Sequence, residues 1–117
     1  MTEDPHEMML YYVVILRIGD KWTPEVTDET KKIREGHFAN IERMVKEGKL
    51  ILAGPFEDFE KKPSPGDWNG LYVIAAESME EARALCDRDP SIVAGRNAAE
   101  IHPWWGPKGI RFGKNQS

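Results

Sequence analysis

Residues Met9–Ile18 of the 117-residue chain read MLYYVVILRI. This stretch is rich in β-branched and aromatic residues and is followed by Gly19 and Asp20, a composition that predicts a β-strand. Side chains alternate between the two faces of a strand. One face carries Leu10, Tyr12, Val14, Leu16 and Ile18, and the other carries Met9, Tyr11, Val13 and Ile15. Because both sets are apolar, both faces of this strand need to be covered.

Three further segments have the composition of strands. Residues 50–56 read LILAGPF, residues 69–76 read NGLYVIAA and residues 98–105 read AAEIHPWW. The strand at 69–76, like the first one, is apolar on both faces. A long polar loop at residues 57–67 precedes it, and loops of this length tend to be functional.

Two amphipathic helices are predicted between the strands. The first spans about residues 24–47, where Thr23 or Asp28 can cap its start and Gly48 its end. Its inward stripe follows helical spacing and consists of Ile33, His37, Ile41, Met44 and Val45. Gly36 lies within this helix, where glycine is unfavourable, so a kink or a helix start there is an alternative.

The second helix opens at Ser78, which forms a capping-box signature with Glu81, and runs to about Arg88. Its predicted inward residues are Met79, Ala82, Leu85 and Cys86. Asp89 is then expected to cap a further short turn that Pro90 begins.

The resulting order, β-α-β-β-α-β, is typical of an α+β domain with a ferredoxin-like antiparallel sheet and both helices on one face. Helices then cover only one face of the two central strands, which are the first and the third. We therefore predict a homodimer through the open sheet face, because monomers rarely expose large apolar patches. The alternative cover is the C-terminal tail. The domain is predicted to span residues 9–105, between an N-terminal extension at 1–8 and a flexible tail at 106–117.

Composition and charge exclude several classes of protein. Hydrophobic residues make up 40% of the chain and charged residues 31%, as in ordinary globular domains. The net charge of −4 has the wrong sign for nucleic-acid binding. The longest apolar run, Met8–Leu16, falls well short of the ~20 residues that span a membrane. Acidic residues precede this run, unlike in a signal peptide, and the lone Cys86 suits a reducing compartment, so we expect a cytoplasmic protein.

Metal and cofactor motifs are absent from the sequence. The three histidines, His6, His37 and His102, lack the spacing of metal ligands. Neither a GxGxxG or Walker pattern nor a GxSxG elbow occurs. We therefore expect neither a metal nor a cofactor.

His37 is the first candidate catalytic residue, because it is the polar member of an apolar helical stripe. Histidine exchanges protons near neutral pH, with an unperturbed pKa of about 6.5. The structural alternative is a core histidine satisfied by one hydrogen bond. Asp89 is the second candidate, since a carboxylate held before Pro90 can orient an imidazole, although capping alone also explains it.

A ligand pocket is expected between the first helix and the sheet. Its predicted lining consists of Tyr12, Pro55, Trp68, His102 and Trp104. Aromatic packing is the simpler explanation for each tryptophan taken singly.

These segments, in their order and spacing, resemble the YCII-related family from about residue 9 to residue 105. The matching pieces are LYYVVIL, REGHFANIERMVKEGKL, AGPF, GLYVI, SMEEARAL, DPSIVAG and EIHPW. AGPF is similar to the DGPF signature of a subgroup, with Ala53 in place of the aspartate. The resemblance implies a dimeric α+β barrel and a histidine–aspartate pair in the active site. The histidine corresponds to His37 and the aspartate to Asp89, with Glu47 and Asp58 as the other carboxylates to consider.

Two functions follow as hypotheses. The first is a small-molecule enzyme in which His37 acts as general acid or base, oriented by Asp89, in an isomerisation or an elimination of the lyase type. The second is a non-catalytic domain that binds a metabolite or serves as an accessory subunit. The surroundings of His37 distinguish them: an imidazole open to a cavity favours catalysis, and one packed solid favours a structural role.

Overall fold

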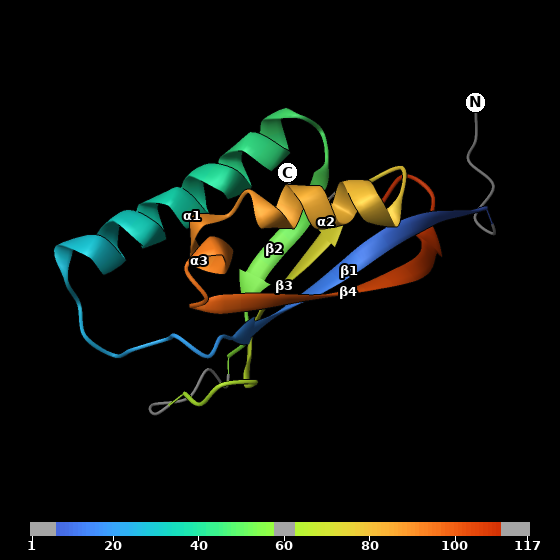
Figure 1. The fold of residues 1–117 in the computed structure, drawn as a ribbon. Helices are drawn as coiled ribbons and strands as arrows, with labels where there is room; N and C mark the ends of the chain where they lie inside the picture. The colour runs from blue at the N-terminus through green and yellow to red at the C-terminus, as the bar shows by residue number, and fades with distance from the viewer. Residues whose placement is uncertain (1–6, 58–62, 111–117) are drawn as a thin grey trace.

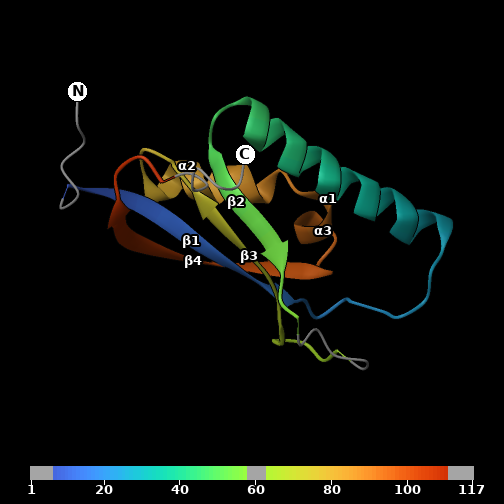
Figure 2. The same ribbon diagram turned by 180° about the vertical axis from the view of Figure 1, so that it is seen from behind.

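The fold is a four-stranded antiparallel sheet with three helices on one face, in a computed structural model that describes residues 7–57 and 63–110. The elements are β1 (Met8–Ile18), α1 (Asp28–Lys46), β2 (Leu50–Pro55), β3 (Trp68–Ile74), α2 (Met79–Asp87), α3 (Pro90–Val93) and β4 (Asn97–Pro107). The strand order is β2-β3-β1-β4, so β1 and β3 are central. Figures 1 and 2 place all three helices on the same side of the sheet. The chain is therefore an α+β domain.

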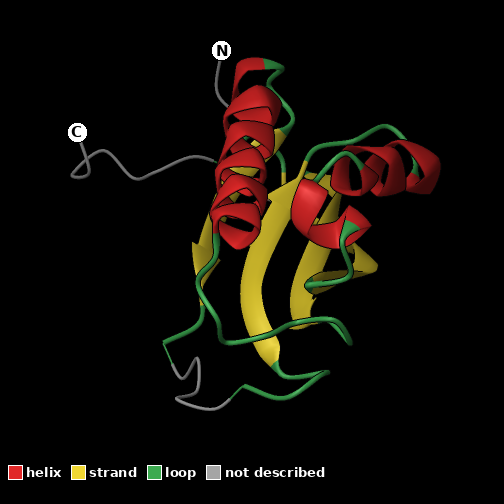
Figure 3. Ribbon diagram, turned by 60° about the vertical axis from the view of Figure 1, so that its left-hand side comes forward, coloured by secondary structure: helices red, strands yellow, loops and turns green. Residues whose placement is uncertain are grey.

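The strand registers assign each side chain to a face of the sheet. Val14 of β1 pairs with Tyr72 of β3 and with Ile101 of β4. These side chains belong to, or pack against, the core cluster beneath the helices, which also contains Met44 and Leu85. Figure 3 shows the helices lying over this face. The core therefore fills the layer between the helices and one side of the sheet.

The start of α1 differs from the prediction. Thr27 is the N-cap, and its side-chain oxygen accepts a hydrogen bond from the backbone N–H of Thr30 at 3.1 Å. The expected caps, Thr23 and Asp28, were wrong, because Thr27 and Thr30 form a reciprocal capping box. Gly48 ends the helix as predicted, with a φ of 72°. The helix runs through Gly36 without a break.

The inward face of α1 is also rotated relative to the prediction. Met44 is fully buried and Ile41 packs against the core, but Val45 is 56% exposed. Asn40, at 1% exposure, lies on the inward face instead of Val45. The Asn40 Nδ2 donates to the Leu85 carbonyl oxygen at 3.1 Å. This bond joins α1 to α2. The prediction for Val45 was wrong because the inward stripe is centred on positions 37, 40, 41 and 44.

The second half of the chain places the caps where the sequence predicted them. Ser78 accepts a hydrogen bond from Glu81 N at 3.0 Å, and Asp89 caps α3. Cys86 is a free, fully buried thiol, as expected of a core residue. Met79, predicted to point inward, is 38% exposed because it lies in the first turn of α2, at the margin of the core.

The sheet face opposite the helices is apolar at its centre. By strand alternation it carries Val13 and Ile15 of β1 and their partners Val73 and Leu71 of β3. Exposed apolar side chains continue it outward, with Leu52 at 39% and Trp104 at 42% exposure. Within the described residues, no helix has both the length and the apolarity that crossing a membrane requires.

Candidate active site

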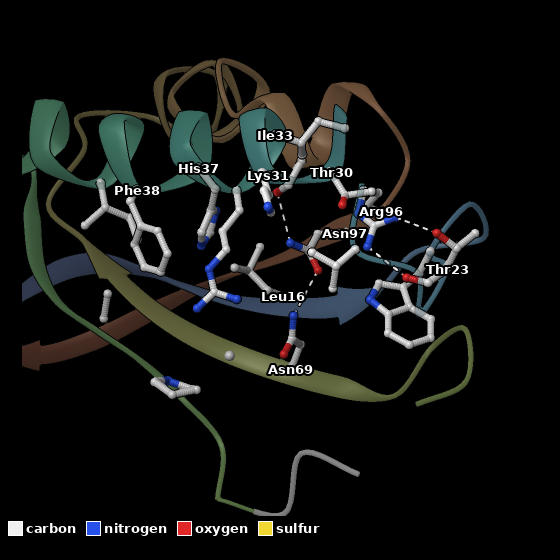
Figure 4. Close-up of a pocket in the computed structure, with 18 of the residues that line it drawn as sticks. Leu16, Thr23, Thr30, Lys31, Ile33, His37, Phe38, Asn69, Arg96 and Asn97 are labelled. Carbon is white, nitrogen blue, oxygen red and sulfur yellow. Dashed lines mark hydrogen bonds between the residues drawn. The ribbon is translucent and has the colours of Figure 1, made fainter. Parts of the chain in front are cut away.

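A cavity of about 720 Å³ lies between α1 and the sheet. Its walls come from α1, the connection between β1 and α1, β2, β3 and the start of β4. Arg96 fixes the connection at one end, because its guanidinium donates to the side chain and carbonyl of Thr23 at 3.1 and 3.0 Å. Figure 4 shows these bonds, with His37 and Phe38 on the α1 wall. Leu16 of β1 and Ser91 of α3 also line the cavity, so segments from most of the described chain bound it.

His37 and Asp89 form a close pair at this cavity. His37 Nδ1 lies 2.6 Å from Asp89 Oδ2. The His37 side chain is 18% exposed and lines the cavity, whereas the Asp89 side chain is fully buried. An ionised carboxylate only accepts hydrogen bonds, so Nδ1 donates to it. In the neutral imidazole the free electron pair is then on Nε2, for which the described residues provide no hydrogen-bond partner.

Asp89 is held from two sides. Its Oδ1 accepts the backbone N–H of Ser91 at 2.8 Å, while Oδ2 accepts His37. Burial by itself raises the pKa of this carboxyl, but the hydrogen bonds from His37 and Ser91 outweigh burial and hold the pKa below its usual value. The carboxylate is therefore ionised at neutral pH and has a fixed orientation.

A chain of hydrogen bonds extends from the pair into the sheet. Ser91 Oγ accepts from Asn97 Nδ2 at 2.9 Å, and Asn97 Oδ1 accepts from Asn69 Nδ2 at 3.0 Å. Figure 4 shows the bond between the two asparagines on the cavity wall. Asp89 is the N-cap of α3, and the network connects this helix to both β4 and β3. It restricts the position of α3 relative to the sheet.

Two aromatic rings flank the imidazole. The ring of Tyr72 stacks on His37 with centroids 6.4 Å apart, and the ring of Phe38 meets it edge-on at 5.3 Å. The Tyr72 hydroxyl is buried and has no hydrogen-bond partner among the described residues. Burial, followed by the nearby charge of Asp89, raises the pKa of Tyr72, so it stays neutral. The imidazole is thus fixed in orientation by a carboxylate and two rings.

This arrangement can transfer a proton at His37 Nε2. A neutral imidazole that faces a cavity accepts a proton from a bound molecule, and the buried carboxylate behind it stabilises the imidazolium that forms. Among the described residues, no three His, Cys, Asp or Glu side chains cluster in a way that would hold a metal ion. Acid–base chemistry is what the residues on this wall are suited to.

The structure separates the predicted pocket residues into three groups. Pro55 lines the cavity with His37, as expected. Tyr12 is on the helix face of the sheet but is buried in the core cluster and does not line the cavity. Trp68, His102 and Trp104 lie on the opposite face of the sheet, so their placement in the pocket was wrong.

Strand alternation is the reason for this error. His102 pairs with Val13 and Trp104 pairs with Tyr11, residues of β1 that point away from the helices. His102 is exposed and contacts Glu100 instead of the cavity. Trp68 lies under the guanidinium of Arg17, at 5.5 Å, on the same open face.

The structure also distinguishes between the carboxylates that were considered as partners of His37. Glu47 forms a two-pronged ion pair with Arg88, with N–O distances of 3.0 and 3.1 Å, and does not contact His37. Asp58 lies outside the described residues. Among the described carboxylates, Asp89 is the one that contacts His37.

Sequence reasoning missed several residues of the site. They are Arg34, Asn69, Tyr72, Ser91, Arg96 and Asn97. Helical spacing offered a signal for Arg34, which lies one turn before His37. The alternation of side chains along a strand was a signal for Tyr72, which is on the same face of the sheet as Val14. The asparagines had no such signal, because their contact depends on the strand register.

Comparisons with known proteins agree with this fold. The model of the YCII-related domain matches residues 9–105. YjpA from Bacillus subtilis (strain 168) is 31% identical over 83 residues, which cover 68% of this chain and 88% of that protein. Protein YciI from Escherichia coli O6:H1 is 37% identical over 65 residues, 54% of this chain and 66% of that protein. Both relatives are similar over a large part of the domain.

A solved structure of similar fold is that of TftG, a 5-chloro-2-hydroxyhydroquinone dehydrochlorinase from Burkholderia phenoliruptrix AC1100, in complex with 2,5-dihydroxybenzoquinone. The TM-score is 0.54 and the sequence identity 20%, over 82% of this chain and 93% of that chain. At this identity the likeness concerns the fold.

Proposed function

The chain belongs to the YCII-related domain family, and from that premise we propose that it is a small-molecule enzyme of the lyase or isomerase type. His37 is the general acid or base, and Asp89 orients it. The reaction moves a proton within a bound substrate, or removes a proton together with a leaving group.

The observation that carries this proposal is the orientation of the imidazole. Its Nδ1 is bonded to the buried Asp89 at 2.6 Å, its Nε2 has no hydrogen-bond partner among the described residues, and the side chain lines a cavity of about 720 Å³. A purely structural histidine would have its ring packed solid against the core, whereas the His37 side chain is 18% exposed and lines the cavity. An imidazole that is bonded through one nitrogen and free at the other favours a catalytic role for His37 over a structural one.

The proposed step begins with a substrate C–H or O–H placed against Nε2. Nε2 takes the proton, and the Asp89 carboxylate stabilises the imidazolium. The electron pair left on the substrate either moves within it, so that the proton returns at another atom, or expels a leaving group. A positioned base supplies roughly 10² to 10⁴ in rate, enough for an activated substrate.

The fold neighbour supports the reaction class. TftG is named as a dehydrochlorinase, and loss of hydrogen chloride requires removal of a proton and departure of chloride. The ring compound in that complex fits the kind of small, oxygenated substrate that a cavity lined by Phe38 and Tyr72 would take. A small-molecule ligand is therefore part of the proposal.

We also propose that the domain is one half of a dimeric α+β barrel with the ferredoxin-like topology. No helix of the described chain lies on the open sheet face, where Leu52 and Trp104 are 39% and 42% exposed. At its centre Ile15 and Val73 are 7% and 8% exposed, so the surface left to cover lies around them. A second copy would cover this face without obstructing the cavity, which lies on the other side of the sheet.

Exchange of substrate C–H for deuterium tests the catalytic role without knowledge of the natural substrate. A panel of small hydroxylated aromatic compounds and organic acids, including 5-chloro-2-hydroxyhydroquinone, is incubated in D₂O and followed by proton NMR, with chloride release as a second readout. We expect acceleration by the wild type and its loss in His37→Asn. The matched control is His102→Asn, which removes an exposed histidine outside the cavity. Equal rates for the wild type and His37→Asn would refute the proposal.

A further inference from the structure

The cavity that contains His37 is positively charged, although the chain as a whole is acidic. Among the described residues, its charged lining consists of Lys31, Arg34 and Arg96 against the carboxylate of Glu25, beside His37 itself. The chain carries a net charge of −4. The lining therefore concentrates cations where the rest of the surface has an excess of acids, and such a site attracts anions.

No described carboxylate neutralises these cations. Within residues 7–57 and 63–110, no carboxylate lies within 4.0 Å of a nitrogen atom of Lys31, Arg34 or Arg96. The one carboxylate directly behind the cavity wall, that of Asp89, is engaged by His37 and Ser91. The positive charge is therefore available to a ligand.

Arg34 is the cation best placed to serve the reacting group. Arg96 uses its guanidinium to bind Thr23, whereas Arg34 has no hydrogen bond to any described residue. Arg34 precedes His37 by three residues, and such positions are neighbours on a helix surface. The Arg34 guanidinium carbon lies 5.4 Å from the Phe38 ring centroid, and the His37 ring lies 5.3 Å from the same ring. Both groups thus meet at Phe38.

We infer that the cavity takes a small planar anion, with its negative oxygen atoms on Arg34 and its ring between the aromatic and aliphatic walls beside His37 Nε2. The guanidinium offers a fork of N–H donors that matches a carboxylate or an ionised hydroxyl. Lys31, one turn before Arg34, adds charge at the same side. This inference deepens the proposed function, since it identifies the substrate class for the same site.

In the inferred arrangement, a cation assists the proton transfer to His37. An anionic oxygen next to the reacting carbon becomes part of an enolate-like system when a proton leaves, and a guanidinium stabilises that charge. Arg34 is therefore a substrate-binding residue that contributes at the step where His37 takes the proton.

Benzoate and benzamide are suitable probes, because they have nearly the same shape and differ in charge. Their binding is measured by ¹⁵N–¹H NMR titration of the full chain, in the wild type and in His37→Asn. We expect benzoate to bind more tightly than benzamide, with shifts at residues 34–38 and a benzoate affinity that falls as salt is added. Because His37→Asn cannot catalyse, retained charge selectivity there separates this inference from the catalytic proposal.

Arg34→Gln identifies the residue responsible. We expect it to weaken benzoate binding by about fivefold or more and to leave benzamide unchanged, as for a solvent-accessible ion pair. Arg34→Lys should retain part of the selectivity. Arg43→Gln is the matched control, since it removes an exposed arginine of the same helix that does not line the cavity. Equal affinities for the two probes, no saturable binding of benzoate, or equal effects of the two glutamine variants would each overturn the inference.

Discussion

Gly36 of α1 lies directly against Pro90 of α3. A Cβ atom at position 36 would be 2.5 Å from Pro90 Cγ, well inside contact distance. Gly36 is next to His37 in the chain, and Pro90 is next to Asp89. The close approach of the two helices therefore sets the distance across which Nδ1 and Oδ2 meet.

Gly36→Ala gives the first prediction. In an exposed helix interior this change stabilises by about 1 kcal/mol, because alanine is the better helix former. Here we expect the opposite sign, a loss of about 1–3 kcal/mol from overpacking against Pro90. Urea unfolding measures the change. Glu35→Ala, at an exposed neighbouring position, is the control and should be near neutral; a stabilised Gly36→Ala would contradict the contact.

Asp89→Asn gives a prediction with a definite pH dependence. The folded-state pKa of Asp89 is below its unfolded value, which is about 3.9. Its stabilising contribution is thus fully present above the unfolded pKa and is lost as the pH falls through the folded pKa. We expect the variant to be less stable by about 1–3 kcal/mol at neutral pH, since a charge-assisted hydrogen bond is lost.

The test compares unfolding free energies of the wild type and Asp89→Asn from neutral to acidic pH. The two curves should converge as Asp89 becomes protonated. Glu47→Gln serves as control, because this carboxylate is exposed and pairs with Arg88, so its loss should not affect His37. Curves that stay parallel to the most acidic pH at which both proteins fold would show that the Asp89 charge does not stabilise the fold.

The open sheet face gives a prediction about assembly. Val13 lies at the centre of that face, between Val73 and His102 in the register. A glutamate there would have to be buried in the proposed dimer, so Val13→Glu should yield a folded monomer. Sedimentation equilibrium measures the mass. Val45→Glu is the matched control on the helix side, where the residue is already exposed. A monomeric wild type would contradict the proposed dimer.

The sequence predicted the elements of the fold because their signals are local. Two-faced apolarity in Met9–Ile18 indicated a central strand, and Ser78 and Asp89 indicated helix caps by residue type and spacing alone. The start of α1 was missed because Thr23, Thr27 and Asp28 are all suitable caps. Only the reciprocal bonds of Thr27 and Thr30 distinguish them.

The site was predicted less completely, since it depends on which elements meet. The contact of His37 with Asp89 joins residues 52 positions apart, and the resemblance left Glu47 and Asp58 open as partners. His102 and Trp104 were placed on the wrong side because a one-residue change in strand parity moves every side chain to the other face. Asn97 and Asn69 meet only through the pairing of β1 with both of their strands.

The tautomer of His37 shows whether Asp89 holds Nδ1 and leaves Nε2 free, and its measurement requires no substrate. Long-range ¹H–¹⁵N NMR on labelled protein reports which ring nitrogen carries the proton in the neutral imidazole. We expect a proton on Nδ1, an unprotonated Nε2, and loss of this preference in Asp89→Asn. A proton on Nε2 in the wild type, or a tautomer unchanged by Asp89→Asn, would show that Asp89 does not orient the imidazole.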